Sequence, residues 1–145
     1  MKVLVVDDSS TMRKIVMKNV RIAANRARAS EPQFVEAGDG NEALEQLGKL
    51  EDIELILCDV NMPNMDGLTF VRTLRKATRH QERNFGVWSL LQRVSNRIPI
   101  IMITTEGGLG KAQEALEAGA NDFLTKPFTP DQLVEKIGRY LVVGR

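Results

Sequence analysis

The stretch at residues 56–68, ILCDVNMPNMDGL, decides the fold. It begins inside an apolar run at 53–57, reaches Asp59 two residues after that run, and leads through a short loop into a helical pattern at about 67–79. Continuous apolar runs with β-branched residues are typical of strands that are buried on both faces. The stretch therefore predicts a buried strand, a loop and a helix, with a carboxylate near the point where the strand ends.

Apolar runs and helical patterns alternate along the rest of the chain. Strand-like runs lie at 3–6, 33–36, 53–57, 98–103 and 122–125, and helical patterns lie at about 10–25, 41–49, 67–79, 109–118 and 130–141. Residues that are suited to cap a helix precede three of these patterns, namely Ser9, Ser10, Asp39 and Thr129. Such alternation favours an α/β fold with a five-stranded parallel sheet, right-handed crossovers and helices on both faces.

The composition suits one compact domain. The chain has 145 residues, of which 43% are hydrophobic, and it contains no internal repeat or Pro-, Gly- or Ser-rich linker, so we expect residues 1–145 to form a single domain. A formal net charge of +1 favours neither nucleic acid nor a membrane as partner. No apolar run approaches the roughly 18 residues of a membrane span, and the run at 3–6 is too short for a signal peptide. We therefore expect a cytoplasmic protein, in which the one cysteine, Cys58, is buried and inert.

Two stretches, at 23–32 and 79–97, are longer than this fold needs. The first is expected to extend the first helix. In the second, apolar residues recur at spacings of three and four, which predicts an added helix or a prolonged third helix. This helix either packs Phe85 and Trp88 on the domain or presents them, among basic residues, as a docking or dimerisation surface. His80, the one histidine, has no ligand partner in the sequence and is expected to be exposed.

Polar side chains follow four of the five predicted strands. Asp7 and Asp8 follow the first strand, Asp59 the third, Thr104 the fourth and Lys126 the fifth. The carboxyl ends of parallel strands meet at one edge of a sheet, where α/β proteins bind ligands. Taken singly, these residues could be a helix cap, a turn former and a solvated charge, but their joint occurrence at four strand ends predicts a site.

Three carboxylates in close quarters repel one another unless a cation lies among them. The candidate ligands are hard oxygens, which favour Mg²⁺ over zinc. With the metal bound, Asp59 can attack a phosphorus centre as a nucleophile, while the Lys126 ammonium offsets the incoming negative charge. Thr104 can then donate a hydrogen bond to a phosphoryl oxygen.

Four runs of the chain closely resemble the receiver domain of bacterial response regulators, above all its stand-alone chemotaxis members. They are VLVVDDSSTMRK at 3–14, ILCDVNMPNMDGL at 56–68, IMITTE at 101–106 and DFLTKPF at 122–128. The resemblance covers the chain apart from the two long stretches. It implies a doubly wound, flavodoxin-like sheet with strand order 2-1-3-4-5. It also implies that Asp7 and Asp8 are the acidic pair, Asp59 the phosphoacceptor, Thr104 the switch hydroxyl and Lys126 the family's lysine.

The resemblance further implies how the metal is held. Mg²⁺ would be bound by Asp8, Asp59 and the backbone carbonyl of Asn61, with Asp7 acting through water. A cis peptide bond between Lys126 and Pro127 would aim the ammonium inward. From the residues themselves, Pro63 is expected to stiffen the loop after Asp59, and Gly67 to allow a tight backbone turn before the next helix.

The resemblance also implies a conformational switch. Phe123 occupies the place of the family's switch aromatic, although it can equally be an ordinary core residue. Residues 108–141 would form the surface that changes on phosphorylation. Asn61 and Glu106 resemble a pairing that favours rapid loss of the phosphoryl group. Thr105 replaces the usual small residue and is expected to hinder the approach of water or a phosphatase. The two features act in opposite directions, so they do not predict the lifetime of the phosphoryl group.

The functional hypothesis is a monomeric signalling switch, not an enzyme with an external substrate. It would accept a phosphoryl group from a histidine kinase or phosphotransfer protein and signal through protein binding, in chemotaxis or motility. A phosphate sink and a phosphorylation-independent binding module are alternatives. A dehalogenase-type phosphatase is disfavoured because Asp7 and Asp8 are adjacent. A flavodoxin-like flavin binder is disfavoured because these two aspartates would repel a flavin phosphate at residues 9–11.

Overall fold

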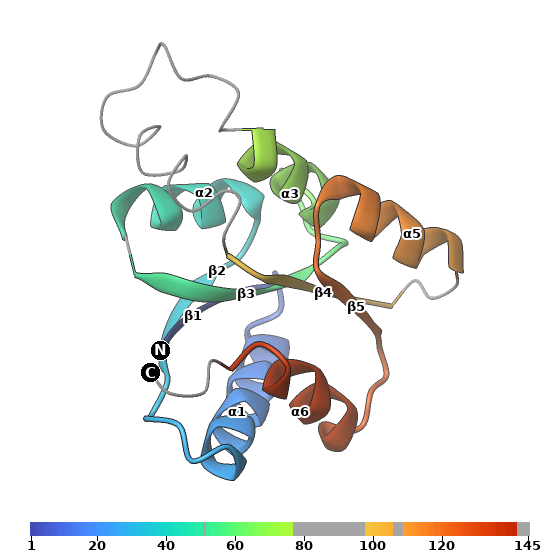
Figure 1. The fold of residues 1–145 in the computed structure, drawn as a ribbon. Coiled ribbons are helices and arrows are strands. Elements are labelled where there is room, and N and C mark those ends of the chain that lie inside the picture. Colours follow the sequence, from blue (N-terminus) through green and yellow to red (C-terminus); the bar gives the residue numbers. More distant parts are fainter. Residues whose placement is uncertain (51, 77–97, 106–108, 142–145) are drawn as a thin grey trace.

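The computed structural model describes residues 1–50, 52–76, 98–105 and 109–141, which form one parallel sheet and the helices that cover it (Figure 1). The strands follow the order β2-β1-β3-β4-β5, which confirms the predicted topology. Their bounds are β1 Lys2–Val6, β2 Gln33–Ala37, β3 Ile53–Asp59, β4 Ile100–Thr104 and β5 Asp122–Thr125. The helices are α1 Ser10–Arg26, α2 Gly40–Lys49, α3 Gly67–Lys76, α5 Leu109–Ala118 and α6 Pro130–Gly138. None of these helices combines the length and the apolar character needed to cross a bilayer.

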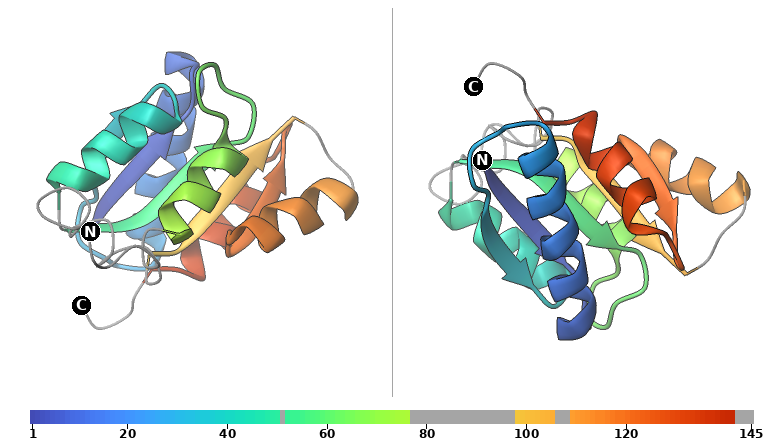
Figure 2. Two further views of the ribbon diagram at one scale, coloured as in Figure 1. Left: turned by 90° about the horizontal axis from the view of Figure 1, so that it is seen from above. Right: turned by 90° about the horizontal axis from the view of Figure 1, so that it is seen from below.

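The helices lie in two layers, one on each face of the sheet. Helices α2, α3 and α5 cover one face, and α1 and α6 lie side by side on the other (Figures 1 and 2). Each layer closes its own apolar core against the alternate side chains of the strands. The central strands β1, β3 and β4 are therefore apolar on both faces, which is why their sequences read as continuous apolar runs.

Three of the helices are capped at their amino ends by residues predicted for this role. The side chain of Ser9 accepts a hydrogen bond from Met12 N, and that of Asp39 accepts one from Glu42 N. Thr129 forms a capping box with Gln132 at the start of α6. Ser10, in contrast, is the first residue of α1 and not its cap.

Some boundaries differ from those expected. Helix α1 ends at Arg26, so the stretch at 23–32 extends it by little. The chain then turns at Arg28, whose φ of 55° is left-handed. Helix α6 ends at Gly138, three residues before the expected end. Strand β4 begins at Ile100, after a proline that has no N–H to donate to a neighbouring strand. The stretch at 79–97 lies outside the described residues.

Arg75 ties the end of α3 to the amino ends of β4 and β5. Its guanidinium donates to Gly119 O at 3.0 Å, to Ile98 O at 2.9 Å and to Asn121 Oδ1 at 3.1 Å. Asn121 Oδ1 also accepts from Ile100 N at 2.9 Å. Hydrogen bonds thus tie together the segments at this edge of the sheet, which is opposite the edge where the sequence predicts a site.

Candidate functional site

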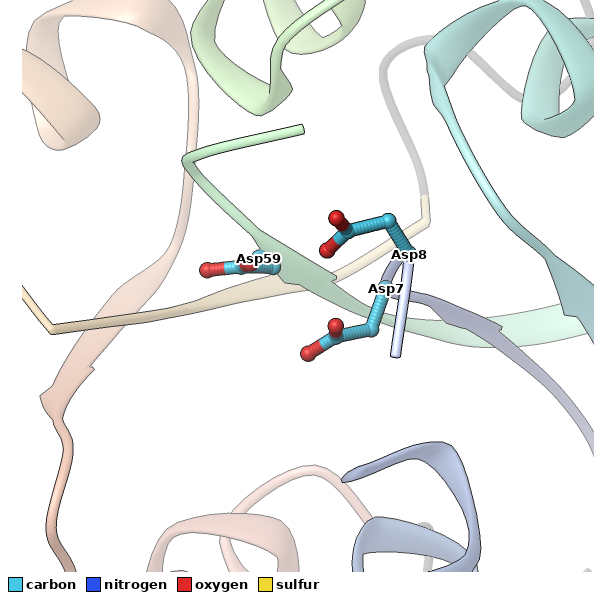
Figure 3. A group of neighbouring side chains, drawn as sticks. All are labelled: Asp7, Asp8 and Asp59. Carbon is cyan, nitrogen blue, oxygen red and sulfur yellow. The ribbon is translucent and has the colours of Figure 1, made fainter. Parts of the chain in front are cut away.

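Three aspartates lie together at the carboxyl edge of the sheet. One carboxylate oxygen from each of Asp7, Asp8 and Asp59 lies within 4.8 Å of the other two. Figure 3 shows the three side chains as neighbours. Asp7 and Asp59 are buried, with 4% and 7% of their surface exposed, whereas Asp8 faces solvent. The structure thus confirms the cluster that the strand ends predicted.

The pairing of two strands explains why these side chains meet. Strands β1 and β3 are parallel neighbours, and Val6 lies opposite Cys58. The next residue on each strand is therefore an aspartate, Asp7 on one and Asp59 on the other. A shift of this pairing by one residue would turn one of the two carboxylates to the other face of the sheet.

Lys126 reaches the same cluster from β5. Its ammonium lies 3.1 Å from Asp7 Oδ2 and 3.6 Å from Asp59 Oδ1. Its backbone N–H donates to Thr104 O at 2.6 Å, which ties the loop after β5 to the end of β4. The peptide bond between Lys126 and Pro127 is cis, as expected.

One ammonium does not balance three carboxylates. Burial raises the pKa of Asp59 to about 6, and the charge of Asp7 adds to this rise. Lys126 and the backbone N–H groups of Asn61 and Val60 oppose the rise without cancelling it. Among the residues that the structure describes, the site is therefore short of positive charge, and its candidate metal ligands are all hard oxygens. This is the donor set and the charge deficit that a bound Mg²⁺ ion would fit.

Asp7 is held by contacts that the sequence did not reveal. The backbone N–H of Ser9 donates to Asp7 Oδ1 at 2.9 Å, and Arg13 donates to Asp7 O at 2.6 Å. Arg13 also pairs with Glu36 of β2 at 2.8 Å. The motif at 3–14 contains Arg13, but its partner lies 23 residues away, so spacing alone could not identify this support.

The loop after Asp59 returns closely to β3. The backbone N–H of Gly67 donates to Val60 O at 2.8 Å. A Cβ atom on residue 67 would clash with the backbone oxygen of Asp59 and lie 2.9 Å from Met102 Cε. Glycine is thus required by the approach of the first turn of α3 to the phosphoacceptor position predicted above.

Cys58 lies beside Asp59 but points into the core. It is fully buried, and its Sγ donates to Asp59 O at 3.2 Å. Burial and the neighbouring carboxylates raise the pKa of the thiol. The prediction that Cys58 is buried is confirmed.

The remaining site residues predicted from the sequence lie on β4, on β5 or in the loops that follow β3 and β4. Thr104 is the last residue of β4 and is fully buried, and Thr105 next to it is exposed. Phe123 is half-buried and packs against the core on the α3 and α5 side of the sheet. Asn61 is exposed in the loop after β3. Glu106 lies outside the described residues.

Comparison with known proteins agrees with this geometry. The family model for the response regulator receiver domain matches residues 3–83 and 85–138. A chemotaxis protein CheY homolog of Campylobacter jejuni is 39% identical over 99% of this chain and 95% of its own. Chemotaxis protein CheY1 of Helicobacter pylori is 42% identical over 94% of each chain.

Solved structures show the same similarity. The structure of Vibrio cholerae chemotaxis protein CheY4 superposes with a TM-score of 0.71 at 34% identity, and the match covers 97% of this chain and 98% of that one. A response regulator structure from Chloroflexus aurantiacus gives a TM-score of 0.72 at 30% identity, over 96% and 95% of the two chains. The chain therefore belongs to the response regulator receiver domain family and is a signalling switch similar to CheY proteins.

Proposed function

We propose that Asp59 accepts a phosphoryl group in a Mg²⁺-dependent reaction and that the phosphorylated domain signals by binding another protein. The observation that supports this proposal best is the carboxylate cluster itself. One carboxylate oxygen from each of Asp7, Asp8 and Asp59 lies within 4.8 Å of the other two, and the Lys126 ammonium lies near Asp7 and Asp59. Such an arrangement is costly to a protein that uses it only as structure, because the buried carboxylates repel one another.

The residues that would hold Mg²⁺ are Asp8, Asp59 and the backbone carbonyl of Asn61, with Asp7 acting through water. When bound, the ion would neutralise carboxylate charge and the charge of phosphoryl oxygens. The exposed position of Asp8 suits this role, because Mg²⁺ retains several waters and enters from solvent.

Each side chain of the site would then have its own role in phosphoryl transfer. A carboxylate oxygen of Asp59 attacks the phosphorus atom of the donor. A new P–O bond forms while the bond from phosphorus to the donor breaks and its electron pair leaves with the donor. Lys126, already 3.6 Å from Asp59 Oδ1, offsets the added charge. The Thr104 hydroxyl would donate a hydrogen bond to a phosphoryl oxygen, and Thr105 and Glu106 would modulate hydrolysis.

We infer that the donor is a histidine kinase or a phosphotransfer protein and that the output is protein binding in chemotaxis or motility. The relatives that are named for chemotaxis support this output. The changing surface would comprise residues 108–141, with Thr104 and Phe123 as the switch. We further propose that residues 1–145 act as one monomeric, cytoplasmic receiver domain.

The test is the intact mass of the protein after incubation with acetyl phosphate, with and without Mg²⁺. Wild type is expected to gain about 80 Da, the mass of one phosphoryl group, when Mg²⁺ is present. Asp59→Asn is expected to gain nothing. Asp122→Asn is the matched control, because it makes the same chemical change at the opposite edge of the sheet and should be labelled like wild type.

Three outcomes would change the proposal. Equal labelling of Asp59→Asn and wild type would place the acceptor elsewhere. Labelling that persists in EDTA would remove the metal from the reaction. No gain under any condition would favour a binding module that is independent of phosphorylation.

A further inference from the structure

The β2–α2 junction, residues 37–40, contacts both the segment that carries the acidic pair and the loop that follows Asp59. On one side, the Asp7 N–H donates to Ala37 O at 3.0 Å, so the pairing of β1 with β2 continues up to the acidic pair. On the other side, the junction contacts the loop at 60–66 that follows Asp59. The junction is thus hydrogen-bonded both to Asp7 and to the loop that follows Asp59.

Two hydrogen bonds join the junction to that loop. Asn64 Nδ2 donates to Asp39 Oδ2 at 2.9 Å, and Gly40 N donates to Met65 O at 3.0 Å. The other carboxylate oxygen of Asp39 accepts from Glu42 N at 2.9 Å, which caps α2. The carboxylate of Asp39 is therefore shared between the start of a helix and the loop. The Glu42 N–H and the Asn64 amide both lower the pKa of Asp39, so it is ionised at neutral pH.

The junction and the loop also pack without spare room. A Cβ atom on residue 40 would lie 2.6 Å from Met65 Cγ and 2.8 Å from Met65 Sδ. Asn64 has a φ of 65°, a left-handed conformation that asparagine tolerates better than most residues do. The sequence at 38–40 and 64–65 thus fits one close arrangement of helix start and loop.

We propose that Asp39, Gly40 and Asn64 are positioning residues that hold the loop at 60–66 and thereby set the affinity of the site for Mg²⁺. The inference rests on the proposed function, because it takes the Asn61 carbonyl in that loop as a ligand. Mg²⁺ demands near-octahedral geometry with short bonds, so ligands on separate loops must keep their spacing. None of the three residues belongs to the carboxylate cluster, so they act through the position of the loop.

Isothermal titration of Mg²⁺ into the unphosphorylated full chain tests this inference directly. Gly40→Ala pushes Met65 away and is expected to weaken the affinity about tenfold, the scale of lost outer-shell support. Asn64→Gly keeps the left-handed backbone but removes the solvent-exposed hydrogen bond, and is expected to weaken it about threefold. Gly110→Ala is the matched control, because among the described residues the added Cβ would meet no atom within 4 Å apart from its own residue, its chain neighbours and its own helix backbone, and it should leave the affinity unchanged.

A charge-neutral exchange sharpens the test. In Asp39→Asn, an amide nitrogen replaces one of the two oxygens that accept from Glu42 N and from Asn64, so one of these two hydrogen bonds is lost. In Asn64→Asp, two carboxylates face each other. The double variant Asp39→Asn/Asn64→Asp again pairs an amide donor with a carboxylate and keeps the net charge. We expect each single change to weaken Mg²⁺ binding about threefold and the double variant to recover to within about 1.5-fold of wild type.

Melting temperatures without Mg²⁺ separate positioning from mere structural support. If Mg²⁺-free stability falls while the affinity of the folded protein stays unchanged, the inference is overturned. Affinities of Gly40→Ala and of both single exchange variants that all match wild type would overturn it as well. Should Gly40→Ala fail to fold, Asn64→Gly and the exchange series decide. If wild type does not bind Mg²⁺, or binds it no better than Asp59→Asn does, the proposed function has failed, which is a different result from failure of this inference.

Discussion

Two aspartates at opposite edges of the sheet have pKa values that are shifted in opposite directions. Asp59 ends β3 at the carboxyl edge, and Asp122 begins β5 at the amino edge. Burial by itself acts to raise the pKa of both carboxyls. For Asp59 this effect prevails and the pKa reaches about 6, whereas hydrogen bonds from Lys136 and Phe123 N outweigh burial and lower the pKa of Asp122.

The difference lies in how each carboxylate is paired. Asp122 accepts from Lys136 Nζ at 2.6 Å and also lies near Arg139 and Tyr140, which all come from the end of α6 or the turn after it. Asp59 must share Lys126 with Asp7, and Lys126 lies closer to Asp7. Within the described part of the chain, the charge of Asp122 at the amino edge is compensated, while the carboxyl edge leaves a charge deficit that a cation from solution can fill. A perturbed carboxyl in such a place indicates function.

The largest expected effect is a rise in the free energy of unfolding when Asp59, at the carboxyl edge of the sheet, is replaced by asparagine. Because the pKa of Asp59 is higher in the folded state, the Mg²⁺-free protein becomes more stable as the pH falls below about 6 and less stable as it rises. Asp59→Asn removes this cost and should stabilise the protein by about 2 kcal/mol at pH 7.5, after allowance for solvent screening, and by about half as much at pH 5.

Urea unfolding followed by circular dichroism in EDTA measures this gain. Asp52→Asn is the control, because that side chain is 65% exposed and its loss should change stability by less than about 0.5 kcal/mol. An Asp59→Asn variant no more stable than wild type at pH 7.5 would contradict the view that the Asp59 charge is poorly compensated.

The next effect is stabilisation by Mg²⁺. At a free concentration ten times the dissociation constant, the ion should raise the free energy of unfolding of wild type by about 1.4 kcal/mol. The same addition should have little effect on Asp8→Asn, which lacks a proposed ligand. Chemical denaturation in Mg²⁺ and in NaCl of equal ionic strength compares the two. Equal stabilisation by both salts would indicate general screening and not a site.

At the amino edge, replacing the aspartate is expected to lower the stability of the protein instead of raising it. Asp122→Asn should destabilise the protein by about 1 kcal/mol at pH 7, because it removes a charged hydrogen bond with Lys136. The folded pKa of Asp122 is lowered, so its contribution is present above the unfolded value of 3.8 and is lost as the pH falls through the folded pKa. Unfolding curves of wild type and variant should therefore converge as the pH falls below 3.8 and through the folded pKa. A constant difference across this range would show that shape, and not charge, is responsible.

The smallest expected effect concerns the two cations near Asp122, whose contributions to stability are predicted to differ. Arg139 lies 3.6 Å from Asp122, and its side chain is 56% exposed, so Arg139→Gln should cost no more than about 0.3 kcal/mol. Lys136→Gln removes the 2.6 Å bond from a side chain that is 25% exposed and should cost about 1 kcal/mol. Thermal melts of both variants test this order. Equal losses would mean that the two cations act as one group.

The sequence predicted the members of the site because their positions follow from strand ends. Once β1 and β3 are recognised as parallel neighbours, Asp7 and Asp59 must lie side by side. Gly67 was also predictable as a tight point, although only the structure identifies Asp59 O as the atom that excludes a Cβ. Elements with strong apolar patterns were placed to within a few residues for the same reason.

Contacts between distant segments were not predictable in this way. The bonds of Arg13 to Glu36 and of Asn64 to Asp39 depend on the positions that the loops adopt after the sheet has formed. Arg75 likewise finds Asn121 across 46 positions of the chain. Charged side chains reach many partners with similar free energy, so residue type and spacing do not choose among them.

The burial of Cys58 gives the chain an internal chemical reporter. The thiol is the one cysteine of the protein, it is fully enclosed, and its raised pKa keeps it protonated. An alkylating reagent can reach it only when β3 is exposed, so the rate of alkylation measures how often the strand that ends in Asp59 opens. Ligands and substitutions at the acidic site can thus be compared in the native protein by mass spectrometry, without any added label.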